Sequence, residues 1–163
     1  MNKMPINKTE HLVYTFLMVI FMASAMTAYN VILHKGFSME SLKIAWLMFP
    51  FTFIAAFLCE WFLVGKLAMR LSHKFLKEDD LLLKKILITA LCFVTGMVVL
   101  MSFFGPLIAN GLQSNLFEIW IKGIPMNFAM AFPLQVIIAG PLVGFVFRKF
   151  FPIGTIVVPG EEV

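Results

Sequence analysis

The 163-residue chain has few charged residues and only two cysteines. Charged residues make up 13% of the sequence and hydrophobic residues 61%, and the mean hydropathy is +0.93. Soluble domains carry about 25% charged and about 45–50% apolar residues, so this chain lacks the polar groups that would cover a soluble globule. A lipid bilayer is the solvent that suits such a composition. We therefore expect an integral membrane protein.

Several kinds of chemistry are also missing from the sequence. It has no nucleophile–base pairing, no metal-ligand spacing and no phosphate-binding glycine loop. Cys59 and Cys92 both lie in apolar stretches, which predicts buried, reduced thiols. The net charge of +4 is too small and too scattered for a nucleic-acid partner. We expect no enzyme, no cofactor and no metal site, and the expected partners are the lipid bilayer and further copies of this chain.

Four hydrophobic stretches are each long enough for a spanning helix of about 20 residues. Their continuity excludes the strands of a membrane barrel, which alternate over about 10 residues. The expected fold is all-α, with four transmembrane helices forming two tandem helical hairpins. The spans run approximately over residues 12–33, 46–68, 86–109 and 124–147.

The basic residues predict the orientation of these spans. Only Lys35, Lys43 and Lys122 fall in the links after the first and third spans, whereas the other ten lie near the termini or in the central link. The positive-inside rule then places both termini and the central link in the cytoplasm. A cleavable secretory signal is the competing interpretation, because Lys3 and Lys8 precede an apolar run that ends in Ala23-Ser24-Ala25.

The chain aligns with itself at an offset of 75 residues without a gap. Glycines, prolines and a terminal Lys-Phe coincide, and apolar sequence does not readily produce such matches by chance. Span one thereby has a counterpart in span three, which argues against its removal as a signal. The matches include Gly36 with Gly111, Pro50 with Pro125, Gly65 with Gly140, and Lys74-Phe75 with Lys149-Phe150. The expected units are a first repeat (1–75), a charged cytoplasmic connector (76–85), a second repeat (86–150) and a tail (151–163).

The repeated glycines and prolines have structural interpretations. Gly36 and Gly111 fit the helix-stop position, where a left-handed backbone suits glycine. The second and fourth spans lead back across the membrane and are called the return segments. Pro50 and Pro125 lie early in them and predict a bend. Two arrangements remain open: a short interfacial helix followed by a proline bend, or one long tilted helix with a kink. In the connector, Asp79 or Asp80 could cap the third span.

The segment "MNFAMAFPLQVIIAGPLVGFVFRKF", residues 126–150, resembles the signature of a bacterial membrane family, the domain-of-unknown-function family 2798. The first half is a weaker copy, because it keeps Ala56-Phe57 but has Leu58 and Lys66 where the second half has prolines. The resemblance implies a small, helical, multi-pass protein of the bacterial inner membrane and no particular activity. The match rests on Gly111, Phe128, Ala131-Phe132-Pro133 and Pro141-Leu142.

Each return segment carries a stripe of one polar, one small and one polar residue at i, i+4 and i+8. Such residues share a helix face, and a polar group within a span should face the protein interior. Ionised Glu60 would cost on the order of 3 kcal/mol at the bilayer centre, and uptake of a proton avoids this cost. We expect the two stripes to face inward across a pseudo-twofold axis. They are Thr52-Ala56-Glu60 and Asn127-Ala131-Gln135.

Two functions fit this stripe. In the favoured one, the protein is a non-catalytic structural or accessory membrane component, and Glu60 fixes helix register through a hydrogen bond to Gln135. In the alternative, it is a small oligomeric transporter or channel for protons, cations or small solutes, with Glu60 as the relay or binding site. Apart from Lys66 at the end of the second span, the spans contain no further acidic or basic residue in support of the alternative. A methionine repeat (Met22, Met26, Met97 and Met101) is interpreted as gap-filling.

Overall fold

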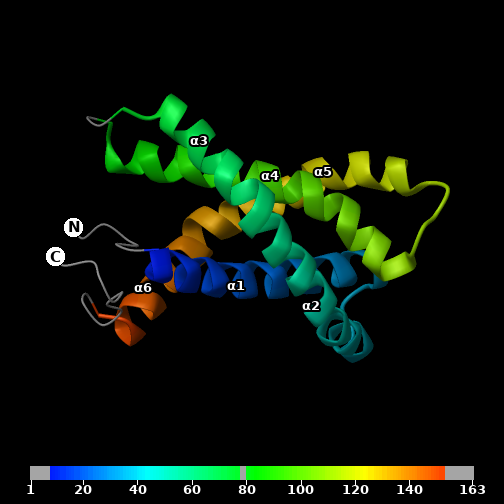
Figure 1. The fold of residues 1–163 in the computed structure, drawn as a ribbon. Coiled ribbons are helices and arrows are strands. Elements are labelled where there is room, and N and C mark those ends of the chain that lie inside the picture. The colour runs from blue at the N-terminus through cyan, green and yellow to red at the C-terminus, as the bar shows by residue number, and fades with distance from the viewer. Residues whose placement is uncertain (1–7, 78–79, 153–163) are drawn as a thin grey trace.

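The computed structural model describes residues 8–77 and 80–152, and every element in this part of the chain is helical (Figure 1). The segment of the competing signal interpretation and the expected tail therefore lie partly outside the described residues. Two of the elements are π-helical turns inside longer helices. The elements are α1 (Lys8–Lys35), α2 (Met39–Cys59), η1 (Glu60–Val64), α3 (Gly65–Phe75), α4 (Leu82–Asn110), α5 (Leu116–Pro133), η2 (Leu134–Ala139) and α6 (Gly140–Phe150).

Four helical segments are long and apolar enough to cross a membrane, which confirms the predicted number of spans. Within the most apolar window of each segment, only 22% to 28% of the residues are buried inside the protein. Most of their apolar surface must therefore meet lipid or another protein. The four segments are Thr9–Lys35, Met39–Phe75, Leu83–Asn110 and Leu116–Phe150.

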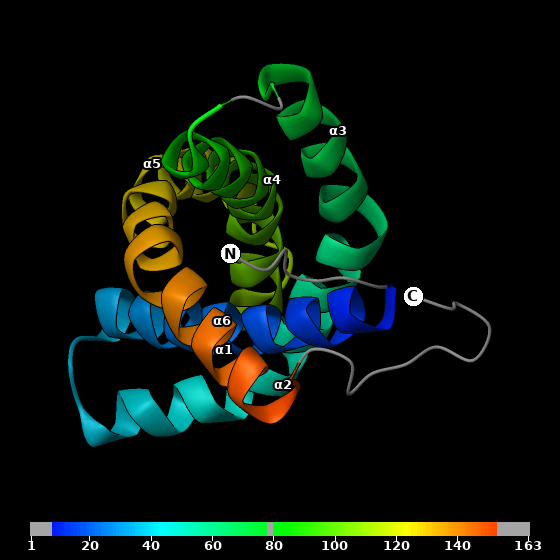
Figure 2. The same ribbon diagram turned by 90° about the vertical axis from the view of Figure 1, so that its left-hand side faces the viewer.

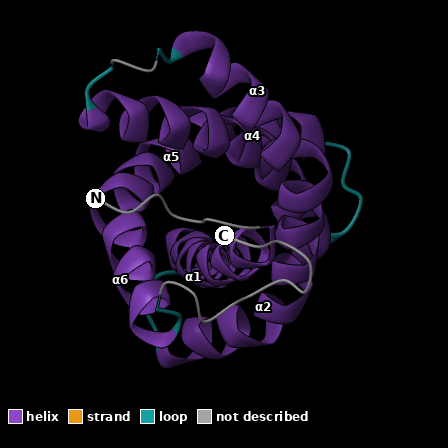
Figure 3. Ribbon diagram, turned by 60° about the vertical axis from the view of Figure 1, so that its left-hand side comes forward, coloured by secondary structure: helices purple, strands orange, loops and turns teal. Residues whose placement is uncertain are grey.

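The helices pack both within and between two halves of the chain, the first half (residues 8–77) and the second half (residues 80–152). Within each half, the first long helix packs along the second, α1 on α2 and α4 on α5. Between the halves, α2 and α3 pack on α4, while α5, η2 and α6 pack on α1. As a result, α1 lies between α2 and α6 (Figure 3), and α4 lies between α3 and α5 (Figure 2).

Glycine ends the first long helix of each half. Gly36 and Gly111 have φ values of 78° and 72°, in the left-handed region that favours glycine. Their amides donate to the carbonyls of Ile32 and Leu107, four residues earlier. In the first half, Ser41 then donates its hydroxyl to the Gly36 carbonyl at 2.8 Å, which fixes the turn into α2.

The return helices run without a break through their prolines. Pro50 lies inside α2 and Pro125 inside α5, and Figure 1 shows α2 changing direction along its length. Each return segment is therefore helical on both sides of its proline and through it. The Thr52 hydroxyl donates toward the carbonyls of Met48 and Phe49, at 3.2 and 3.0 Å. Bonds of this kind, from a hydroxyl to a carbonyl of the preceding turn, often bend a helix.

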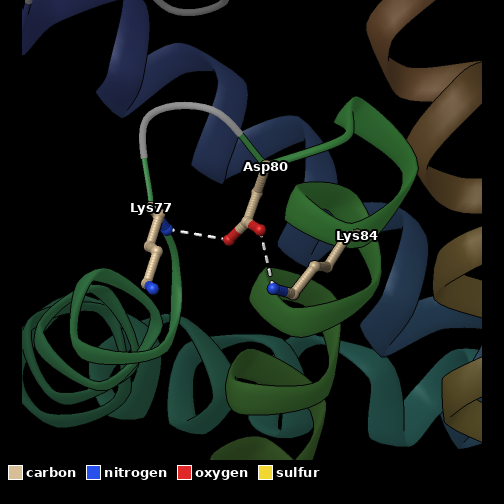
Figure 4. A network of polar contacts seen from close by, with 3 residues as sticks. All are labelled: Lys77, Asp80 and Lys84. Atoms are coloured by element: carbon tan, nitrogen blue, oxygen red, sulfur yellow. Dashed lines mark hydrogen bonds and ion pairs between the residues drawn. The ribbon is translucent and has the colours of Figure 1, made fainter.

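The central link is held by Asp80 (Figure 4). Its Oδ2 accepts from the Lys77 amide at 2.8 Å, and its Oδ1 accepts from Lys84 Nζ at 2.7 Å. The amide of Lys77, and then Lys84, hold the pKa of the Asp80 carboxyl below its usual range. Leu81 occupies the N-cap position of α4 without a side-chain cap. The prediction that Asp80 caps this helix is therefore wrong, because its carboxylate closes the preceding turn, and Asp79 lies outside the described residues.

Candidate functional site: the cavity between the two halves

A cavity of about 2010 Å³ lies between the two halves. Residues of all six α-helices line it, together with both π-helical turns. The lining extends from His11 and Arg148 at one end of the bundle to Lys35 and Asn110 at the other. Pockets for drug-sized molecules are about 300–1,000 Å³. This cavity is therefore large enough for a small organic solute.

The lining is built from equivalent positions of the two halves. Both polar stripes reach it, and so do the methionines that repeat between α1 and α4. Both halves therefore contribute equivalent positions to one cavity. The equivalent lining pairs include Met22 with Met97, Met26 with Met101, Thr27 with Ser102, Thr52 with Asn127, Ala56 with Ala131, and Glu60 with Gln135.

A hydrogen bond inside each half holds the first polar residue of its stripe. The hydroxyl oxygens of Thr27 and Thr52 are 2.9 Å apart. In the second half, Asn127 Nδ2 donates to Ser102 Oγ, also at 2.9 Å. Both bonds join the first helix of a half to its return helix. Asn127 Oδ1, in contrast, is buried and has no hydrogen-bond partner among the described residues.

Glu60 lines the cavity and is only 7% exposed. In the described part of the chain, no hydrogen bond or ion pair engages its carboxyl group. Gln135 also lines the cavity and is half-buried, but the hydrogen bond expected between the two side chains is not formed among these residues. The structure brings both to one cavity without joining them.

A π-helical turn positions each of these two residues. The Gly65 amide donates to the Glu60 carbonyl five residues earlier, and the Gly140 amide donates to the Gln135 carbonyl. A Cβ on Gly65 would lie 2.8 Å from the Glu60 oxygen, and one on Gly140 would lie 3.1 Å from the Gln135 oxygen. Glycine therefore permits both turns. Isolated π turns are frequent at functional sites, and the only sequence signal was a polar residue five positions before a repeated glycine.

A buried ion pair that the sequence did not reveal joins the halves near one end of the cavity. Arg148 Nη2 of α6 lies 3.5 Å from Glu10 Oε2 of α1. Glu10 is 1% exposed, and the Arg148 guanidinium also stacks over the Phe147 ring at 5.2 Å. Both residues stand near the ends of spans, where charges ordinarily face water. This pair therefore connects the beginning of the first half to the end of the second.

Most of the cavity lining is apolar and rich in methionine. Met22 and Met26 of α1 pack against a cluster of the second half, while Met97 and Met101 pack against one of the first half. Methionines of each half therefore pack against the other half. The eight methionines on the lining are Met18, Met22, Met26, Met48, Met69, Met97, Met101 and Met126.

The structure offers no alternative metal centre within the described residues. No group of three or more His, Cys, Asp or Glu side chains in this part of the chain could hold a metal ion. Both cysteines are free, and Cys59 is buried. Cys92 is only half-buried, so the prediction of a fully buried thiol is wrong at that position.

Comparison with known proteins identifies the family. A family model described as a domain of unknown function, DUF2798, matches residues 7–76 and again residues 83–151. The uncharacterized protein YybC of Bacillus subtilis (strain 168) is 36% identical over 151 residues, which cover 90% of this chain and 94% of the relative. No solved structure matches significantly. The chain therefore belongs to the DUF2798 family and contains its unit twice.

Proposed function

We propose that this protein is a non-enzymatic transporter of the bacterial inner membrane that carries a small solute through the cavity between its halves. One observation supports this choice over a purely structural role: Glu60 lies buried on the cavity lining without a protein partner in the described part of the chain. A structural carboxyl group would be expected to hydrogen-bond a neighbouring helix.

The energetics of burial support the same choice. An ionisable side chain in a membrane span is costly and commonly belongs to a pathway for ions or substrates. Here the nearby polar residues of the first stripe are already satisfied, since Thr52 bonds to Thr27. Glu60 remains available to whatever enters the cavity. The duplicated lining would then present two similar surfaces to that solute.

We also propose the orientation and the homo-oligomeric assembly that the sequence predicts. Both termini and the central link would be cytoplasmic, since the basic residues concentrate there. The Glu10–Arg148 pair would then lie at the cytoplasmic end of the cavity. A homo-oligomer is supported by the small buried share of each span, which leaves large apolar faces for lipid or another copy.

The test is the access of water-soluble reagents to the cavity from both sides of the membrane. Thr52→Cys would be made in a Cys59→Ala/Cys92→Ala background and treated with a membrane-impermeant thiol reagent in right-side-out and inside-out vesicles. The matched control is Ile54→Cys, two residues away, because Ile54 lies on the outer surface with 57% of its area exposed.

A transporter should allow labelling of Thr52→Cys from both sides, because its site must open alternately to each. Ile54→Cys should remain unlabelled, since lipid surrounds it. Labelling of Thr52→Cys from one side only, or from neither, would contradict transport. Labelling from neither side would instead favour the structural or accessory component.

A further inference from the structure

Resting on the proposed function, we infer that the solute is a lipophilic organic cation, held by the unpartnered carboxylate of Glu60 inside the methionine-rich cavity. This class of solute follows from the charge, the burial and the lining of the cavity.

The charge on the lining is arranged to hold a cation at depth. Glu60 is the only acidic residue among the described residues that line the cavity. It lies 15 residues before the end of α3 at Phe75, which is about 22 Å along a helix at 1.5 Å per residue. The remaining ionisable residues of the lining stand near helix ends. They are His11, Tyr14, Lys85, Arg148 and Lys149 toward one end, and His34, Lys35 and Lys122 toward the other.

This arrangement disfavours an anion and a small inorganic cation. An anion drawn to the basic helix ends would find no positive charge farther inside, where Glu60 is the only acidic or basic residue among the described lining residues. A small metal cation needs several oxygen ligands to replace its water, yet no group of three or more acidic, histidine or cysteine side chains gathers in the described part of the chain. A large organic cation needs only one counter-charge, because apolar contacts replace the rest of its hydration.

The lining also suits a bulky and apolar body. Methionine side chains are flexible and polarisable, so they adapt to irregular shapes, and methionine-rich surfaces bind varied partners. Aromatic side chains stand among them, including Tyr14 and Phe93, whose faces attract cations. With about 2010 Å³ available, several ring systems would fit beside Glu60. We therefore expect tolerance of shape and strict selection for positive charge.

Tetraphenylphosphonium is the probe, and tetraphenylborate is its control, since the two ions are similar in size and apolar surface and opposite in charge. Binding would be measured by equilibrium dialysis of radiolabelled tetraphenylphosphonium with the full-length protein in detergent micelles. We expect saturable binding to the wild-type protein. Glu60→Gln should weaken it at least tenfold. Tetraphenylborate is measured in a separate dialysis, because the two ions pair with each other, and it should show no saturable binding.

The duplication supplies a second variant that separates loss of charge from loss of structure. Glu60→Gln/Gln135→Glu moves the carboxylate to the equivalent position on the same cavity, and it should recover binding lost in Glu60→Gln. Size-exclusion chromatography and circular dichroism would establish that both variants are folded.

Three results would each overturn the inference: no saturable binding to the wild-type protein, equal binding to folded Glu60→Gln, or no recovery in the folded double variant. Thr52→Cys labelling separates this failure from that of the proposed function. If the cavity is labelled from both sides but tetraphenylphosphonium does not bind through Glu60, only the class of solute is wrong.

Discussion

The hydroxyl oxygens of Thr27 and Thr52 lie 2.9 Å apart, and the same contact recurs 75 positions later between Ser102 and Asn127. Thr27→Val and Thr52→Val should therefore be non-additive. Hydrogen bonds between membrane helices have coupling energies averaging about 0.6 kcal/mol. A double-mutant cycle on unfolding in mixed detergent–SDS micelles would measure this coupling. Ser24→Ala is the control, because Ser24 is exposed and bonds only within its own helix. Strict additivity of the two valine substitutions would contradict the prediction.

The Glu10–Arg148 pair should stabilise the contact between the halves. Removal of one partner of a buried ion pair strands the other charge, which costs about 3–5 kcal/mol at full burial. The side chain of Arg148 is 16% exposed, so we expect a loss of about 2 kcal/mol or more for Arg148→Gln. Lys149→Gln removes the same charge from an exposed neighbour and should change stability little. Chemical unfolding in detergent would measure both, and equal effects would exclude a special role for the pair.

Gly65→Ala should strain the first π turn, because the added methyl group would lie 2.8 Å from the Glu60 carbonyl oxygen. Overpacking of this kind costs about 1–3 kcal/mol. Gly140→Ala should cost less, since its contact is 3.1 Å. Gly144→Ala meets nothing within 4 Å and should raise stability by up to about 1 kcal/mol through helix propensity. Thermal unfolding in detergent would rank the stabilities of the three variants. If Gly65→Ala were the most stable of them, the prediction that this substitution strains the first π turn would be wrong.

Asp80 should make the central link sensitive to acid. Its pKa is depressed in the folded protein, chiefly by the Lys77 amide. The carboxylate therefore contributes stability above the unfolded-state pKa of about 3.9, and this stability is lost as the pH falls through the lower folded-state value. NMR titration of the carboxyl group would show the depression.

Two variants test what lowers the pKa of Asp80 and what this carboxylate stabilises. Lys84→Gln removes the ammonium group that donates to Asp80 Oδ1 and should raise the Asp80 pKa only in part, because the backbone amide of Lys77 remains. Asp80→Asn should remove the acid-dependent loss of hydrogen-exchange protection at the start of α4. A pKa that returned fully to its ordinary value in Lys84→Gln would show that the amide is unimportant.

The cytoplasmic placement of the termini is open to a direct test. Reporters fused after Val163 and into the link around Lys77 should both be active only in the cytoplasm, because the basic residues cluster there. A reporter in the loop at Gly36 should behave in the opposite way. External activity of the C-terminal reporter would overturn the orientation and, with it, the side assigned to the Glu10–Arg148 pair.

Much of the fold could be predicted from the sequence. Long apolar runs have few options in a bilayer other than helices, so the four spans followed from their lengths. The ungapped offset marked the duplication, and the family match covers the same two segments. Gly36 and Gly111 were visible as repeated glycines between the runs, and both have positive φ values.

The candidate site was less predictable, because it depends on contacts between the halves. The offset aligns Glu60 with Gln135 but does not state the distance between them, and the structure places both on a shared cavity. The two π turns were invisible because one altered turn barely changes helical periodicity. The Glu10–Arg148 pair could not be predicted, since sequence position near a span end does not distinguish an exposed side chain from one that is 1% exposed.

The paired π turns bear on the history of the chain. A turn closed by an i to i−5 bond contains one residue more than an α-helical turn, so acquiring it in one half alone would have broken the constant offset of 75 residues. Gly65 and Gly140 instead close equivalent turns with the register intact. The simplest account is that an ancestral single unit already contained this turn before its gene was copied and joined. The difference between the carboxyl group of Glu60 and the amide group of Gln135 would then have arisen after the duplication, in a turn that both halves inherited.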